Sequence, residues 1–125
     1  MNMSFSITLD SFSDGSKDVT RRLGWLKLKP GDIVNAVEKV RGLKKGQRIK
    51  KLGVIKIVSA TRERLDCIEY SPFRDDDSHT GGIRKETVRE GFPAYSPAEF
   101  VSMFCKFNGC KPTDLVTRIV FLRVQ

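Results

Sequence analysis

Several features that would point to particular protein classes are scarce or absent in this 125-residue chain. No apolar run approaches the roughly 20 residues of a membrane-spanning helix, and residues 1–9 lack the basic start and long apolar stretch of a signal peptide. The three cysteines form no C-x-x-C pair, which argues against a disulfide framework and fits a reducing compartment. With His79 as its only histidine, the chain also lacks a good zinc ligand set. We therefore expect a cytoplasmic protein with no metal and no cofactor.

Charge is abundant, and it is unevenly distributed. The formal net charge is +8, and residues 17–64 carry 15 Lys or Arg against 4 Asp or Glu. Residues 65–90 reverse the balance, with 4 basic residues against 7 acidic ones. A concentrated cationic face favours a polyanionic partner, and nucleic acid is the commonest one in the cytoplasm. A generic solubilising surface is the alternative interpretation.

Residues 15–25 hold the densest set of candidate functional groups. Two glycines bracket Lys17, Thr20 and a pair of arginines, and the only tryptophan of the chain ends the segment. Backbone N–H groups and cations in such a segment can hold a phosphate or a carbonyl oxygen. Lys17 also places an amine three residues from the Thr20 hydroxyl. A solvated turn with ordinary surface charges is the competing interpretation.

The pattern Gly15-x-Lys17-x-x-Thr20-x-Arg22 resembles the G-x-K-x-x-E-x-R signature of ASCH domains, which are relatives of the PUA RNA-binding domains. Thr20 stands where that signature has glutamate. Later segments resemble, in order, the family's entry into its second strand, its central strand, and its late loop and helix: residues 29–34, 52–58, 89–93 and 99–101. The similarity covers nearly the whole chain and is closest to forms carried by phages and bacteria.

The residue patterns predict one mixed α+β domain spanning residues 1–125, with 39% hydrophobic and 30% charged residues. A helical turn is expected to end near Gly15, and Gly53 is expected to mark a bulge or bend. Residues 32–40 also fit one face of a helix, but β-branching favours a strand. The other expected segments are strands at 4–7, 52–61 and 115–124, a hairpin loop at 43–47 and a loop region at 71–89.

Residues 96–99 predict the start of a helix, with Ser96 as its cap and Glu99 completing a capping box. Four apolar residues then share one face and should pack into the core, and Gly109 should end the helix. These four residues are Phe100, Val101, Phe104 and Phe107. The last strand is apolar on both faces, which indicates a sheet curled into a small barrel. The family resemblance implies, more specifically, a PUA-like β-barrel with short flanking helices.

As a binding module, the chain would contact phosphates through its cations and stack an unpaired base on an aromatic ring. The resemblance implies single-stranded RNA, although charge alone does not separate RNA from DNA. Trp25, Phe92 and Tyr95 are the stacking candidates, and each is alternatively a core residue. The candidate cations are Arg21, Arg22, Lys44, Lys45, Arg48, Lys50 and Lys51, together with Lys17, Lys27 and Lys29.

As an enzyme, the chain would use Lys17 to take a proton from the Thr20 hydroxyl. Because residues three apart point oppositely in a strand, the backbone between them must be bent or helical. The resemblance adds that one ASCH branch with this Lys-x-x-Thr spacing contains N4-acetylcytidine amidohydrolases, which also use a later glutamate. That glutamate corresponds to Glu90, with Glu86 as the alternative. Other ASCH members resemble ribonucleases that cut single-stranded RNA without metal.

The sequence therefore predicts an ASCH-type domain that binds RNA or a nucleotide-derived ligand in a basic cleft. Lys17, Thr20, Arg22 and Glu90 should converge there. The alternative is a small metal-independent hydrolase of an acylated nucleoside or of single-stranded RNA, with Lys17, Thr20 and Glu90 as catalytic residues. A third alternative is an interaction protein that engages a ribonucleoprotein through the basic face.

Overall fold

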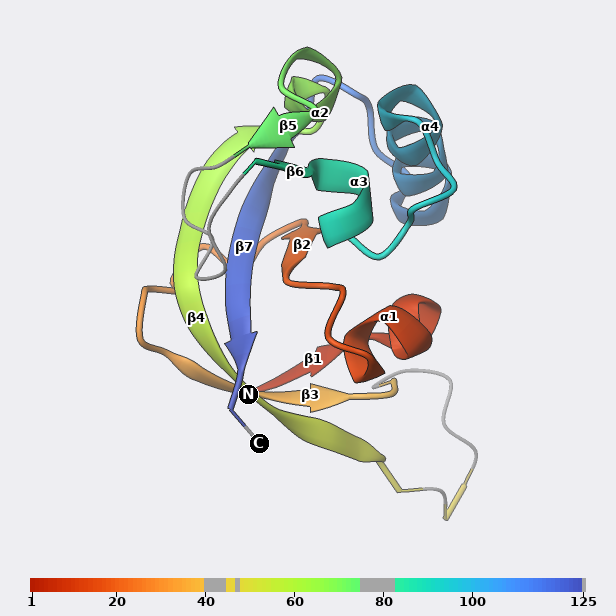
Figure 1. Cartoon of the computed structure of the whole chain (residues 1–125). Helices are drawn as coiled ribbons and strands as arrows, with labels where there is room; N and C mark the ends of the chain where they lie inside the picture. The colour runs from red at the N-terminus through yellow and green to blue at the C-terminus, as the bar shows by residue number, and fades with distance from the viewer. Residues whose placement is uncertain (40–44, 47, 75–82, 125) are drawn as a thin grey trace.

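A computed structural model describes residues 1–39, 45–46, 48–74 and 83–124. Its centre is a five-stranded sheet with the strand order β1-β3-β4-β7-β2, in which β4 and β7 are long and curved (Figure 1). β1 runs parallel to β3, and the other neighbouring strands are antiparallel. The strands are β1 (Asn2–Ser4), β2 (Val19–Arg22), β3 (Ile33–Val37), β4 (Lys51–Arg64) and β7 (Leu115–Arg123). The mixed α+β class is thus confirmed, and β1 and β2 stand at the two edges of the described sheet.

Three of the four predicted strands are confirmed, with adjusted ends. Residues 32–40, 52–61 and 115–124 contain or overlap β3, β4 and β7. The pairing of β3 with β4 shifts register next to Gly53, where a bulge was expected. The strand predicted at residues 4–7 is wrong in its bounds, because β1 ends at Ser4. Phe5 leaves the strand and stacks on Phe12, with ring centroids 4.6 Å apart.

Short helices connect β1 to β2. The 3-10 helix η1 (Ser6–Thr8) and helix α1 (Leu9–Ser13) follow β1 directly. The backbone N–H of Gly15 donates to the carbonyl of Phe12, so the helical segment ends where the sequence predicted. This arrangement carries Lys17 away from the helix and toward the start of β2.

The region predicted as a loop, residues 71–89, contains regular structure at both of its described ends. β5 (Phe73–Arg74) pairs with β6 (Arg84–Lys85), and helix α3 (Glu86–Arg89) follows immediately. Helix α2 (Cys67–Tyr70) precedes this pair, and residues 75–82 lie outside the described part of the chain. The loop prediction is wrong at residues 84–89 because charged residues there were taken as solvated. The side chains of Glu86 and Arg89 are instead fully buried.

Helix α4 (Pro97–Asn108) has the predicted capping box. The Glu99 N–H donates to Ser96 Oγ at 3.1 Å, and the Ser96 N–H donates to Glu99 Oε1 at 2.9 Å. Gly109 ends the helix with a left-handed φ of 66°, a conformation that glycine adopts without steric cost. One part of the predicted buried face is wrong: Phe107 is 68% exposed, because the core ends one turn earlier.

Two separate apolar clusters support this fold. The first lies between the sheet and the N-terminal segment, and includes Phe5, Phe12, Ile57 and Phe121. The second lies under α4, where Phe100 and other α4 residues pack against α2 and the start of β7. Burial of apolar surface in both clusters is the main stabilising contribution to such a domain. No helix in the described residues is long and apolar enough to cross a membrane.

Candidate functional site

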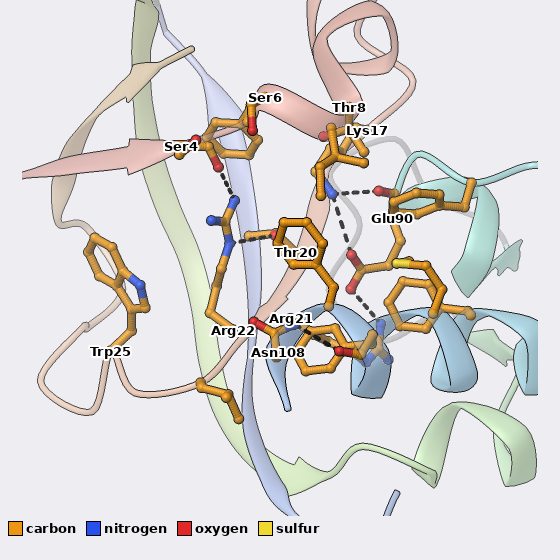
Figure 2. A pocket seen from close by; sticks show the side chains of 18 of the residues that line it. Ser4, Ser6, Thr8, Lys17, Thr20, Arg21, Arg22, Trp25, Glu90 and Asn108 are labelled. Carbon is orange, nitrogen blue, oxygen red and sulfur yellow. Dashed lines mark hydrogen bonds and ion pairs between the residues drawn. The ribbon is translucent and has the colours of Figure 1, made fainter. Parts of the chain in front are cut away.

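A cavity of about 620 Å³ is lined by residues of both apolar clusters, and its wall comes from β1, η1, β2 and α4. This volume is within the range of small-molecule sites, about 300–1,000 Å³. Lys17, Thr20, Arg22 and Glu90 all line it, and Figure 2 shows their side chains around the same space. The structure therefore brings together the four residues that the sequence predicted to converge.

Lys17 and Glu90 form a buried pair in this pocket. Lys17 Nζ donates to the backbone carbonyls of Val19 at 2.9 Å and Glu90 at 2.5 Å, and lies 3.4 Å from Glu90 Oε1. Glu90, rather than Glu86, is thus the carboxylate that faces Lys17. Burial lowers the pKa of Lys17 to about 8. The attraction of Glu90 opposes this shift, while the positive charge of Arg22 adds to it.

Thr20 and Arg22 form a second polar pair on β2. Residues two apart lie on the same face of a strand, and Arg22 Nε donates to Thr20 Oγ1 at 2.9 Å. Arg22 Nη2 also donates to the carbonyl of Ser4 at 2.5 Å, and the guanidinium lies 5.0 Å from the centre of the Phe5 ring. Burial lowers the pKa of Arg22 to about 10. Both described hydrogen bonds of Arg22 therefore go to neutral oxygens.

The expected contact between Lys17 and Thr20 takes a different form in the structure. Thr20 belongs to β2, whereas Lys17 precedes the strand, so the two side chains reach the same pocket without a helical turn between them. The hydrogen bonds described for the two residues join Lys17 to Glu90 and Thr20 to Arg22. Proton transfer between Lys17 and Thr20 would thus require a bridging group or a small side-chain movement.

Arg21 departs from the prediction of a phosphate contact. Its side chain is fully buried, and it donates to Glu90 Oε2 at 3.0 Å and to Glu86 Oε1 at 2.7 Å. Glu63 Oε2 lies 3.4 Å from the same guanidinium. These carboxylates raise the pKa of Arg21 despite its burial. Arg21 therefore fixes one oxygen of Glu90 while the other oxygen faces Lys17.

Glu86 is the centre of a buried charge cluster behind the pocket. Its carboxylate accepts from Arg21, from Arg118 Nε at 2.8 Å and from Arg89 Nη1 at 3.4 Å. Burial alone raises the pKa of Glu86, but the hydrogen bonds and charges of Arg118 and Arg21 outweigh it and hold the pKa below its ordinary value. Sequence reasoning missed this cluster. Its one local signal was a charged residue, Arg118, inside the apolar last strand.

Aromatic and apolar side chains form the walls of the pocket. Trp25, Phe92 and Phe107 all line it. Trp25 is half-buried against the first apolar cluster. Tyr95, the third stacking candidate, packs instead on Phe92 and the second cluster. The exposure of Phe107, which the helical pattern did not predict, places an aromatic ring at this site.

The predicted cations within residues 45–51 do not line the pocket. Lys44 is outside the described residues, and four others are exposed on the surface: Lys45, Arg48, Lys50 and Lys51. Lys50 lies 3.8 Å from Glu38. Lys39, which the sequence analysis did not single out, lines the pocket. An exposed set of basic residues near the start of β4 is thus separate from the basic residues that line the pocket.

No protein-family model, curated protein or solved structure matches this chain. Function must therefore be argued from the chemistry of the pocket rather than from the fold. Within the described residues, no group of three or more His, Cys, Asp and Glu side chains could hold a metal ion.

Proposed function

We propose that this chain is an ASCH-type domain whose pocket binds single-stranded RNA or a nucleoside-derived ligand. One observation carries the proposal: Lys17, Thr20, Arg22 and Glu90 line one pocket that also has aromatic walls. A nucleobase needs an aromatic surface to stack on and hydrogen-bonding groups along its edge. Glu90 supplies acceptors, Lys17 supplies donors, and the Thr20 hydroxyl can act as either.

Arg22 is the residue best suited to an anionic or carbonyl oxygen of the ligand. Its guanidinium is partly desolvated, and its described hydrogen bonds use neutral partners. A phosphate at this place would form a charge-assisted hydrogen bond, which is stronger than a neutral one. The exposed lysines near the start of β4 would add long-range attraction for an RNA chain, and salt would weaken that attraction.

We also propose that the five-stranded sheet curls into a PUA-like barrel. Its support is the curvature of β4 and β7, together with the bond from Arg22 on β2 to the carbonyl of Ser4 on β1 (Figures 1 and 2). These two strands are the edges of the described sheet. A side chain that links them would hold a curled sheet nearly closed, with the pocket at the seam.

Arg22→Met is expected to weaken binding of cytidine 5′-monophosphate by about 10- to 100-fold, because a hydrogen bond to a charged group is worth roughly 1.5–3 kcal/mol. Calorimetry gives the affinity, and the emission of Trp25, the only tryptophan, reports whether the ligand enters the pocket. Lys51→Met, an exposed cation outside the pocket, is the matched control and should bind as the wild type does. Equal affinities of the wild type and Arg22→Met would contradict the proposal.

A second candidate function is hydrolysis of an acylated nucleoside, and the Lys17–Glu90 contact favours it. In this reaction neutral Lys17 would take the Thr20 proton while Thr20 Oγ forms a bond to the acyl carbon. The C–N bond would then break as the leaving amine takes that proton from Lys17, directly or through the Glu90 carboxylate. Water would finally hydrolyse the threonine ester and release the acid. Each proton is thus returned to the product, and no co-reactant other than water is needed.

If Lys17 is the base, kcat/KM for N4-acetylcytidine should rise with pH through about 8 and level off above it. At pH 7 the rate should be roughly one tenth of the plateau, because only the neutral amine is active. Chromatographic assay of cytidine between pH 6 and pH 10 measures this profile. A rate that is flat or falling across pH 8 would remove Lys17 as the base.

The stability of the fold adds a second pH dependence in the same direction. The pKa of Lys17 is lowered by folding from 10.5 to about 8, so the folded chain binds fewer protons than the unfolded chain between these values. The contribution of Lys17 to the free energy of unfolding therefore increases as the pH rises through this window. A thermal-melting control at each pH separates the two effects.

A further inference from the structure

A second cavity, of about 390 Å³, shares two of its wall residues with the first. Leu23 and Trp25 line both cavities, so the Trp25 side chain stands at the boundary between them. The other residues of the second cavity are Met1, Leu26, Lys27 and Leu28. It is not lined by Lys17, Thr20, Arg22 or Glu90. The proposed function therefore does not use this second cavity.

Trp25, at this boundary, has a left-handed backbone conformation. Its φ is 55°, and it is the only non-glycine residue with a positive φ in the described part of the chain. A left-handed conformation at a bulky residue costs on the order of 1–3 kcal/mol and persists only where its surroundings enforce it. Gly24 precedes it with a φ of 80°, and its carbonyl accepts from Thr117 Oγ1 at 2.5 Å. The chain is thus held in a conformation that sets the indole between the two cavities.

The second cavity combines exposed apolar surface with one cation. Met1 is 72% exposed and Leu26 is 69% exposed, which are high values for large apolar side chains. Lys27 is also exposed beside them. A stacking ring, an apolar floor and a neighbouring ammonium group suit a base joined to a phosphate. Neither a purely apolar ligand nor a free anion would use all three features.

From this we infer that the pocket takes an oligonucleotide, with two consecutive bases on either side of Trp25 and their linking phosphate beside Lys27. The inference rests on the proposed function and narrows its ligand class. One base occupies the cavity with Lys17 and Glu90, and its neighbour occupies the cavity with Leu26. The ligand therefore extends through both cavities instead of ending at the first.

Calorimetry with cytidine 5′-monophosphate and with the 5′-phosphorylated dinucleotide pCpC, which keeps the phosphate that Arg22 is proposed to bind, tests the inference. The dinucleotide should bind the wild type about tenfold or more tightly than the mononucleotide, which corresponds to one additional stacked base. Leu26→Ser and Lys27→Ala should each reduce this advantage and leave mononucleotide affinity unchanged. Both residues are exposed, so neither substitution should disturb folding. Lys51→Ala, outside both cavities, is the control for general electrostatic attraction.

The outcomes separate the inference from the function on which it rests. Equal affinities for the two ligands in the wild type would overturn the second site and leave the first intact. A loss at Lys27→Ala that Lys51→Ala reproduces would also overturn it, because general charge would then explain the effect. Binding of neither ligand would overturn both the proposed function and the inference.

Discussion

Glu86→Gln is expected to lower the free energy of unfolding by about 3–5 kcal/mol, the usual cost of removing one partner from a buried ion pair. The side chain of Glu86 is fully buried and accepts hydrogen bonds from Arg21, Arg89 and Arg118. Glutamine has nearly the same shape but no charge. The substitution thus leaves three buried guanidinium groups facing a neutral amide. A loss of this size is a large part of the roughly 5–15 kcal/mol that stabilises a typical domain.

Urea denaturation followed by circular dichroism measures this effect. Glu69→Gln is the matched control, because Glu69 lies on α2 and its side chain is exposed. That variant should stay within about 0.5 kcal/mol of the wild type. Stability should also fall in acid, since the pKa of Glu86 is lowered by folding and its contribution is lost as the carboxylate is protonated. An equally stable Glu86→Gln protein would show that the cluster does not depend on this charge.

Lys17→Met is expected to reduce hydrolysis of an acylated nucleoside by about 10²–10⁴-fold, the usual contribution of a general base. Methionine keeps an unbranched apolar side chain of similar shape but lacks the amine that faces Glu90. Stability should change much less than in Glu86→Gln. Glu90 retains its bond from Arg21 at 3.0 Å, and the cost of burying an ammonium group disappears.

The hydrolysis assay also needs a control for the exposed basic residues near the start of β4. Neutralising Lys45, Lys50 and Lys51 together should leave turnover of a nucleoside unchanged, because none of the three lines the pocket. The triple variant should nevertheless bind single-stranded RNA more weakly and with less salt dependence. Full activity of Lys17→Met would exclude Lys17 as the general base. Absence of turnover by the wild type would exclude the hydrolase and leave the binding function as the sole proposal for the pocket.

Sequence patterns correctly predicted the helices and strands that depend on residues close together in the chain. The capping box of α4 needs only Ser96 and Glu99, three residues apart, and it is present as predicted. The apolar patterns of β4 and β7 likewise identified strands, because alternation and β-branching act within a few residues. Helical spacing, however, gives the direction of a side chain and not the extent of the core. Phe107 was therefore assigned to the interior although it lines the pocket.

The ion pairs between residues far apart in the chain could not be predicted from the sequence. Glu86 and Arg118 are 32 positions apart, and Lys17 and Glu90 are 73 positions apart. A run of charged residues such as 84–90 has the composition of a solvated loop unless its partners are known. Arg21 was assigned to a phosphate contact for the same reason, whereas its side chain is buried against Glu86 and Glu90. Glu90 was selected only by family resemblance, and the left-handed backbone of Trp25 had no signal beyond the preceding glycine.

Photo-cross-linking of single-stranded RNA that carries 4-thiouridine tests the central claim most directly. The claim is that the pocket of Lys17, Thr20, Arg22 and Glu90 holds the base of a nucleic-acid ligand. Mass spectrometry of the cross-linked peptides should then identify those that contain Trp25, Phe92 or Phe107. Competition by unlabelled cytidine should reduce these cross-links. Cross-links confined to the exposed lysines near the start of β4, and unaffected by cytidine, would contradict the account.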